Sequence, residues 1–282
     1  MKDFRFQIKT IDELTLRGRG WAPGAEAKAV VCLVHGLGEH CGRYAHVAEA
    51  FNRAGYALMT CDLRGHGKSE GKRGHAANYT ALMDDIFQLL ETAKEQYPDL
   101  PVFLYGHSLG GNLAIHYALR RLPKLAGIVA TAPLFRPAAK PPAWKMALLR
   151  AMVGVWPSLS ISSALEMAAL SRDSKVVQAY RNDPLTHDWI SARLAVDMLR
   201  YGKWNMMHAA DLPSPLLLMH GTADRITSPT ASREFALRAD AACTLKMWDG
   251  LYHELHNEPE QNQVLDYMLE WVETHATKTP HS

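Results

Sequence analysis

The chain has 282 residues, 48% of them hydrophobic, so it can bury one large core and does not require a second independent domain. Thirty-one Lys and Arg residues stand against 29 Asp and Glu residues, which leaves a formal net charge of +2. A charge this small provides no field to attract nucleic acid, so the composition predicts no nucleic-acid partner. It leaves the oligomeric state open.

The N-terminal segment MKDFRFQIKTIDEL alternates polar and apolar residues and lacks the uninterrupted apolar stretch of a secretory signal. No later window offers a clean membrane-spanning run. The four cysteines, Cys32, Cys41, Cys61 and Cys243, form no CxxC pair, so a disulfide framework is not expected. These features together predict a cytoplasmic protein.

Residues 4–10 and 13–21 alternate in polarity, which predicts an antiparallel hairpin at a sheet edge. Helical stretches at 44–54, 79–96 and 112–121 follow, separated by short apolar runs that predict strands. The predicted strands after the hairpin are 30–34, 57–61, 102–105, 127–131, 216–220 and 244–248. Because strand and helix alternate, we expect an α/β fold with a mostly parallel central sheet flanked by helices.

This alternation breaks between residues 135 and 207, where prolines separate helical segments with no predicted strand between them. We interpret 135–207 as a helical cap inserted after the sixth strand, with 1–134 and 208–282 forming the core. Within the cap, the helix at 144–156 is apolar around most of its circumference. Such a helix is either buried on all sides, or it covers a lipid pocket and touches a membrane surface.

The run VFLYGHSLGG contains the pattern G-x-S-x-G directly after a predicted strand and before a predicted helix. A turn of this kind holds its central residue in a strained conformation, and glycines at Gly106 and Gly110 avoid collisions with the neighbouring strand and helix. The bare pattern also arises by chance, but its placement indicates that Ser108 is a nucleophile at a helix N-terminus.

A serine hydroxyl needs a histidine to take its proton and a carboxylate to orient that histidine. In this arrangement the acid and then the histidine follow the serine, each just after a later strand. Asp224 and His253 meet that rule. Asp249 and Asp211 are weaker candidates for the acid, and the alternative base is His256.

The developing oxyanion needs two backbone N–H donors, one from the residue after the serine and one from a loop after an earlier strand. Leu109 and Leu37 are the predicted donors. The loop VHGLGEH can bring Leu37 close because Gly36 and Gly38 let its backbone turn. Losing one such donor costs about a hundred- to a thousandfold in rate.

The same loop offers a competing interpretation, because Gly36, Gly38 and Gly42 follow a strand and Asp62 ends the next one. This resembles the fingerprint of a dinucleotide-dependent oxidoreductase, although the spacing is GxGxxxG. A non-catalytic binding module of the same fold is a further alternative. The segments HGKS and HELHN fall short of a phosphate loop and a zinc site, so no cofactor and no metal are expected.

Six segments, HGLGEHCGRY, DLRGHGKSEG, GHSLGG, NDPL, HGTADRITSP and YHELHNEPE, resemble the monoacylglycerol lipases and bacterial lysophospholipases of the α/β-hydrolase fold. The resemblance spans nearly the whole chain and thins in the cap. It implies a lipase with a mobile cap that cleaves one acyl chain from glycerol through an acyl-enzyme, with the same catalytic triad. It also implies that Glu39, Arg43 and His256 receive the glycerol head, with Tyr180 nearby; otherwise Glu39 and Arg43 are a surface ion pair worth little.

The triad does not select the substrate, so a lysophospholipase or a general carboxylesterase remains an alternative to a monoacylglycerol lipase. Each buried methylene is worth about 0.8 kcal/mol, so an apolar tunnel can favour long acyl chains. Trp144, Leu148 and Met152 of the cap helix are the residues expected to line it. The predicted partner is thus a small lipid ester, with transient contact between the cap and a membrane surface as an accompanying hypothesis.

Overall fold

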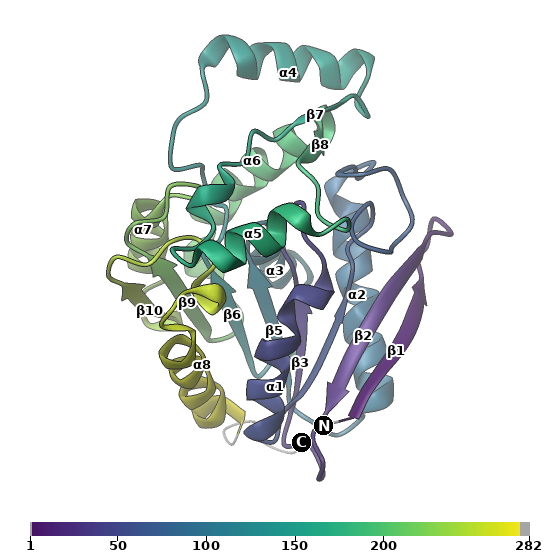
Figure 1. Cartoon of the computed structure of the whole chain (residues 1–282), viewed down its shortest axis with the longest axis vertical. Helices are drawn as coiled ribbons and strands as arrows, with labels where there is room; N and C mark the ends of the chain where they lie inside the picture. The colour runs from purple at the N-terminus through teal and green to yellow at the C-terminus, as the bar shows by residue number, and fades with distance from the viewer. Residues whose placement is uncertain (1, 277–282) are drawn as a thin grey trace.

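A central sheet of eight strands organises the protein in the computed structural model, which describes residues 2–276 (Figure 1). The strand order is β1-β2-β4-β3-β5-β6-β9-β10. The strands are β1 (Lys2–Lys9), β2 (Thr15–Ala22), β3 (Val30–Val34), β4 (Ala57–Cys61), β5 (Val102–His107), β6 (Gly127–Thr131), β9 (Leu216–Gly221) and β10 (Cys243–Trp248). All pairs from β4 to β10 are parallel, while β1 and β2 form an antiparallel hairpin that joins β4 at one edge. The predicted α/β class and the edge hairpin are confirmed.

The inner strands are apolar along their length because helices cover both faces of the sheet. One face packs against α1 (Ala45–Arg53) and α8 (Gln261–Ala276), through residues such as Phe51 and Met268. The other packs against α2 (Tyr79–Gln96), α3 (Leu109–Arg121) and α7 (Pro229–Ala239), through residues such as Ile86 and Phe235. Short 3-10 helices are η1 (Cys41–Tyr44), η2 (Met167–Ala169), η3 (Ala209–Asp211), η4 (Asp240–Ala242) and η5 (Leu255–Asn257).

The chain leaves the sheet after β6 and returns to it at β9. The intervening elements are α4 (Ala143–Val155), β7 (Ser160–Ser162), α5 (Ser174–Asn182), β8 (Trp189–Ser191) and α6 (Ala192–Met207). These elements lie above the sheet, and α6 ends at Met207 (Figure 1). The division into a core and a cap at 135–207 stays a prediction. The prediction that no strand lies within residues 135–207 is corrected, because β7 and β8 pair antiparallel. Strands of three residues are too short to produce a readable alternation.

Helix α4 stands at the outer end of the molecule, and none of its residues is buried (Figure 1). Trp144 is 71% exposed, Leu148 55% and Val155 83%. The interpretation that this helix is buried on all sides is therefore wrong. Within residues 2–276, no helix is both long enough and apolar enough to cross a bilayer.

Candidate active site

Ser108 occupies the turn between β5 and α3 with φ 54° and ψ −115°, a conformation that strains any residue other than glycine. Its backbone is fixed on both sides, because its N–H donates to Thr131 O at 2.9 Å and its carbonyl accepts from Asn112 N at 3.0 Å. A Cβ at Gly106 would collide with the Gly110 carbonyl, and a Cβ at Gly110 with the Val34 carbonyl. The two glycines therefore allow the turn, which places Ser108 in the wall of a cavity under the cap.

Asp224 and His253 come together although 29 positions separate them, because they follow the neighbouring parallel strands β9 and β10. His253 Nδ1 lies 2.8 Å from Asp224 Oδ2, and His253 lines the same cavity as Ser108. The other oxygen of Asp224, Oδ1, accepts from the N–H groups of Ile226 at 2.7 Å and Thr227 at 3.1 Å. The carboxylate is thus held from its far side while it orients the imidazole.

The charges of this pair reinforce each other. Burial acts to lower the pKa of His253, but the adjacent Asp224 carboxylate outweighs it and leaves the pKa raised. Burial likewise acts to raise the pKa of Asp224, and the neighbouring histidines outweigh it and leave that pKa lowered. A proton taken up by His253 is therefore stabilised, as a general base requires.

A second buried histidine binds the same carboxylate and was not singled out from the sequence. His220 Nε2 lies 3.0 Å from Asp224 Oδ2, and His220 Nδ1 lies 2.7 Å from Ser232 Oγ. His220 is fully buried at the end of β9 and does not line the cavity. Its two contacts hold it beside the Asp224 carboxylate. The only sequence signal was its place four residues before Asp224 at the end of an apolar strand.

Leu37 and Leu109, the predicted oxyanion donors, both line the cavity beside Ser108. Leu109 begins α3, where the first N–H groups of a helix lack partners within the helix. Gly38 bends the other loop with φ 76°, and its carbonyl accepts from Tyr180 Oη at 3.1 Å and His187 N at 2.9 Å. The insertion thereby holds the loop that carries Leu37.

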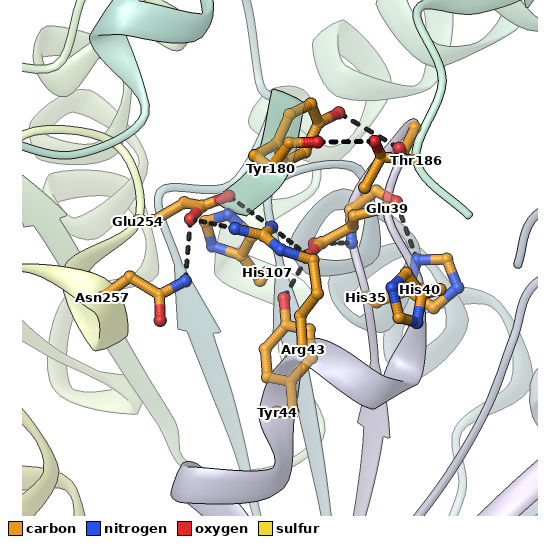
Figure 2. Close-up of polar contacts among 12 residues, drawn as sticks. His35, Glu39, His40, Arg43, Tyr44, His107, Tyr180, Thr186, Glu254 and Asn257 are labelled. Carbon is orange, nitrogen blue, oxygen red and sulfur yellow. Dashed lines mark hydrogen bonds and ion pairs between the residues drawn. The ribbon is translucent and has the colours of Figure 1, made fainter. Parts of the chain in front are cut away.

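Glu39 and Arg43 belong to a buried ionic cluster with Glu254, the residue after His253 (Figure 2). Arg43 Nη1 donates to Glu39 Oε2 at 2.8 Å and to Glu254 Oε1 at 2.6 Å, while Nη2 donates to Glu254 Oε2 at 2.7 Å. Tyr44 Oη and Gly36 N donate to the second oxygen of Glu39, Oε1. The cluster joins the loop that carries Leu37 to the loop that carries His253. The interpretation of Glu39 and Arg43 as a surface ion pair is wrong.

Arg43 and His256 do not line the cavity, whereas Glu39 and Tyr180 do. The guanidinium of Arg43 is occupied by two carboxylates, with its Cζ 4.8 Å from the centre of the Tyr180 ring. His256 is fully buried, and its ring lies 4.8 Å from that of Tyr44. The structure therefore corrects the expectation that Arg43 and His256 contact a glycerol head directly.

The competing acids and base have different surroundings. Neither nitrogen of the His256 ring has a hydrogen-bond partner among the described residues, and burial holds its pKa well below the usual value. Asp249 is exposed and accepts from Thr222 Oγ1 at 3.0 Å, and Asp211 is exposed in η3. Asp224 and His253, in contrast, form a buried pair, and His253 lines the cavity that contains Ser108.

His107, the residue before Ser108, packs its ring 4.8 Å from that of His253. Burial lowers the pKa of His107 to about 3, and the nearby His253 adds to this effect. A neutral ring here avoids a second positive charge against His253 when that residue takes up a proton.

The cavity has a volume of about 390 Å³, and apolar side chains of the insertion form much of its wall. Trp144, Leu148 and Met152 are not among them, which corrects that expectation. Helix α4 is rotated so that Met146 and Leu149 face the cavity while Trp144 and Leu148 face outward. With apolar residues on every side, its sequence pattern could not define this rotation.

Asp62, which suggested a dinucleotide site, is engaged by the backbone of its own region. Its Oδ1 accepts from Cys41 N at 2.8 Å and its Oδ2 from Lys68 N at 2.7 Å. Both oxygens therefore stabilise loop turns, and Asp62 is only 3% exposed.

A serine at a strained turn after a parallel strand, followed by an Asp–His pair beyond β9 and β10, defines the serine hydrolases of the α/β-hydrolase fold. Residues 25–260 match the model of the family Hydrolase_4, described as serine aminopeptidase, S33. The chain belongs to this family.

Similar proteins include an abhydrolase domain-containing protein of Dictyostelium discoideum, 40% identical over 94% of this chain and 28% of that protein. A monoacylglycerol lipase of Mycolicibacterium smegmatis is 35% identical over 90% of this chain and 91% of its own length. The crystal structure of a monoacylglycerol lipase from Paleococcus ferrophilus is similar to this structure, with a TM-score of 0.82 and 34% sequence identity. The match covers 98% of this chain and 100% of the other.

Proposed function

We propose that the protein hydrolyses monoacylglycerols, with Ser108 as nucleophile, His253 as general base and Asp224 as the acid that orients it. One observation carries this proposal: an apolar cavity of about 390 Å³ is lined by both Ser108 and His253. The monoacylglycerol lipases of Mycolicibacterium smegmatis and Paleococcus ferrophilus support the substrate class.

In the proposed reaction, Ser108 Oγ attacks the ester carbonyl carbon while its proton passes to His253 Nε2. The N–H groups of Leu37 and Leu109 stabilise the oxyanion. His253 then gives the proton to the glycerol oxygen, which leaves, and the acyl group remains as an ester on Ser108. A water molecule gives a proton to His253 and attacks that ester; the bond to Ser108 Oγ breaks, His253 returns the proton to Ser108 Oγ, and the fatty acid is released.

The cavity wall supports an acyl chain because Met146, Leu149 and Ile190 and several other apolar residues contribute to it. Each methylene buried there stabilises the bound state by about 0.8 kcal/mol. Charged side chains of both signs line the cavity, among them Glu39, Glu254 and Lys145. We favour monoacylglycerols over lysophospholipids because the similar proteins of Mycolicibacterium smegmatis and Paleococcus ferrophilus are monoacylglycerol lipases.

The exposed apolar side chains of α4, including Trp144, Leu148 and Val155, support transient contact with a lipid surface. This contact would bring the cap to the place where the substrate is found. A cytoplasmic location, peripheral to the membrane, remains our prediction, and cell fractionation checks it.

The test is a kcat/KM series over monoacylglycerols, lysophosphatidylcholines and p-nitrophenyl esters, with Ser108→Ala as the blank. We expect long-chain monoacylglycerols to be the best substrates and a fluorophosphonate probe to label the parent protein but not Ser108→Ala. Higher kcat/KM for lysophosphatidylcholine would favour the lysophospholipase alternative, and higher values for short p-nitrophenyl esters would favour a general carboxylesterase. A folded parent protein that resists the probe would refute the proposal.

A further inference from the structure

A second groove lies on the outer side of the insertion, between α4 and α6, with a volume of about 690 Å³. Its α4 residues, Ala143, Met146 and Arg150, are spaced at i, i+3 and i+7 and so share one helix face. Pro141, Met146 and Leu199 line both this groove and the cavity that contains Ser108. The groove is therefore separated from the candidate active site by a wall of side chains.

Four cations line this groove, namely Lys140, Arg150, Arg200 and Lys203, and no carboxylate does. All four are exposed, and within residues 2–276 none of them forms an ion pair. Asp197, the acidic residue of α6, is buried and lies 3.8 Å from Arg193. Arg200 Cζ also lies 5.5 Å from the centre of the Tyr201 ring. Because no carboxylate of the described chain pairs with any of the four cations, their charge is available to an anionic ligand.

The wider sequence reinforces this charge pattern. Residues 135–165 contain no Asp or Glu, although the chain as a whole is nearly neutral with a net charge of +2. No carboxylate close in the sequence therefore neutralises Lys140 or Arg150.

Apolar side chains accompany the cations. Trp204 and Met207 line the groove, and Met207 is 60% exposed. A nucleic acid or an acidic peptide would leave this apolar surface in water. A lipid surface with anionic headgroups satisfies both the cations and the apolar side chains.

We infer that the groove between α4 and α6 binds the phosphate headgroup of an anionic phospholipid in a bilayer. This inference rests on the proposed function, in which the cap contacts a lipid surface; the inference names the lipid headgroups on that surface. Headgroups bound by Lys140, Arg150, Arg200 and Lys203 hold α4 at the interface, with the wall formed by Met146 and Leu199 between the lipid and the Ser108 cavity.

Co-sedimentation with vesicles tests this site. One set of vesicles is phosphatidylcholine alone. The other is a 7:3 mixture of phosphatidylcholine with phosphatidylglycerol, in which about one lipid in three is charged, so its surface is strongly anionic. The test variant replaces Lys140, Arg150, Arg200 and Lys203 by Gln. The matched control makes the same change in charge at distant exposed cations by replacing Arg5, Arg17, Lys68 and Lys124 by Gln.

We expect the parent protein to bind the mixed vesicles and to lose that binding at high salt. One cation near an anionic surface contributes about 1 kcal/mol, or about fivefold in partitioning. Loss of two such contributions or more should therefore weaken binding of the test variant at least about twentyfold. The control variant should stay within about threefold of the parent, because its cations do not face the same surface. A conservative variant, with Lys and Arg exchanged at the four groove positions, should keep the binding.

The inference is overturned if the parent binds pure phosphatidylcholine as well as the mixture, or if the control variant loses as much binding as the test variant. It is also overturned if inorganic phosphate releases the protein more effectively than sodium chloride of equal ionic strength, since the groove would then take a free anion. Hydrolysis of p-nitrophenyl butyrate is measured in every variant and should be unchanged. Absence of that activity in the parent counts against the proposed function, whereas vesicle binding alone decides the headgroup site.

Discussion

Replacing His220 by leucine should slow hydrolysis although His220 touches neither the cavity nor Ser108. The change removes the N–H donor 3.0 Å from Asp224 Oδ2 and the partner of Ser232 Oγ at 2.7 Å. Leucine can occupy the buried space at the end of β9, so the main loss is polar. Asp224 keeps its bonds to His253, to Thr227 Oγ1 at 2.8 Å and to two backbone N–H groups.

The size of the effect follows from the bond removed. A hydrogen bond to a charged group contributes about 1.5–3 kcal/mol, and we expect the free energy of unfolding to fall by about this amount. If the loosened carboxylate passes the same loss to the transition state, kcat falls about ten- to a hundredfold. KM should change little because His220 does not line the cavity.

The pH profile separates a positioning role from a purely structural one. Without His220, the charge of Asp224 acts more strongly on His253 and raises further a pKa that is already above 6.5. Because only neutral His253 can act as a base, the acid limb of the kcat/KM profile should move to higher pH.

The assay is a kcat/KM profile on p-nitrophenyl butyrate between about pH 5 and 9, chosen to span the ordinary histidine pKa. Thermal unfolding in parallel confirms that each variant is folded. His220→Gln restores a donor toward Asp224 and should recover most of the rate, while Ser232→Ala keeps that donor and should lose less than His220→Leu. Unchanged kcat/KM in His220→Leu at every pH, or equal losses in the Leu and Gln variants, would refute the reasoning.

Three further predictions follow. Arg43→Met leaves two buried carboxylates without a counter-charge and should lower the free energy of unfolding by about 3–5 kcal/mol in urea denaturation; a loss below about 1 kcal/mol would contradict it. Met146→Ala should lower the kcat/KM preference for dodecanoyl over butyryl esters by about fivefold, because Met146 lines the cavity. Trp144→Ala should leave this preference unchanged, because Trp144 is exposed. Equal effects of the two substitutions on soluble esters would count against the assigned rotation of α4. Burial lowers the pKa of His107 to about 3 and that of His116 to about 4, so as the pH falls the unfolded chain takes up these protons before the folded one does. The free energy of unfolding should therefore decrease below about pH 6.5, by up to about 1.4 kcal/mol per pH unit for each histidine. Equal free energies of unfolding at pH 7 and pH 5 would argue against neutral buried rings.

Local patterns were enough to predict most of the fold. The predicted strands 30–34, 57–61 and 127–131 agree with β3, β4 and β6, and the predicted helix 79–96 agrees with α2. These elements are long or strongly apolar, so their own side chains define them. The predicted helix at 112–121 begins earlier in the structure, at Leu109, because the turn at Ser108 passes directly into α3.

The candidate site could be predicted where topology orders it. Ser108, Asp224 and His253 each follow a strand of a parallel sheet, and the carboxyl ends of such strands meet at one edge. Residues that act through long-range contacts had no such rule. Glu254 meets Arg43 across 211 positions, and His220 was indistinguishable from other polar residues at a strand end.

The sequence by itself determined the α/β class, the order of the inner elements and the candidate nucleophile with its partners, because each depends on local periodicity or on position after a strand. Only the tertiary structure decided which side of α4 faces the cavity, since a helix with apolar residues all round has no preferred face until it packs. It also decided that Glu39 and Arg43 are buried, because their burial depends on Glu254 and Tyr180 from distant parts of the chain.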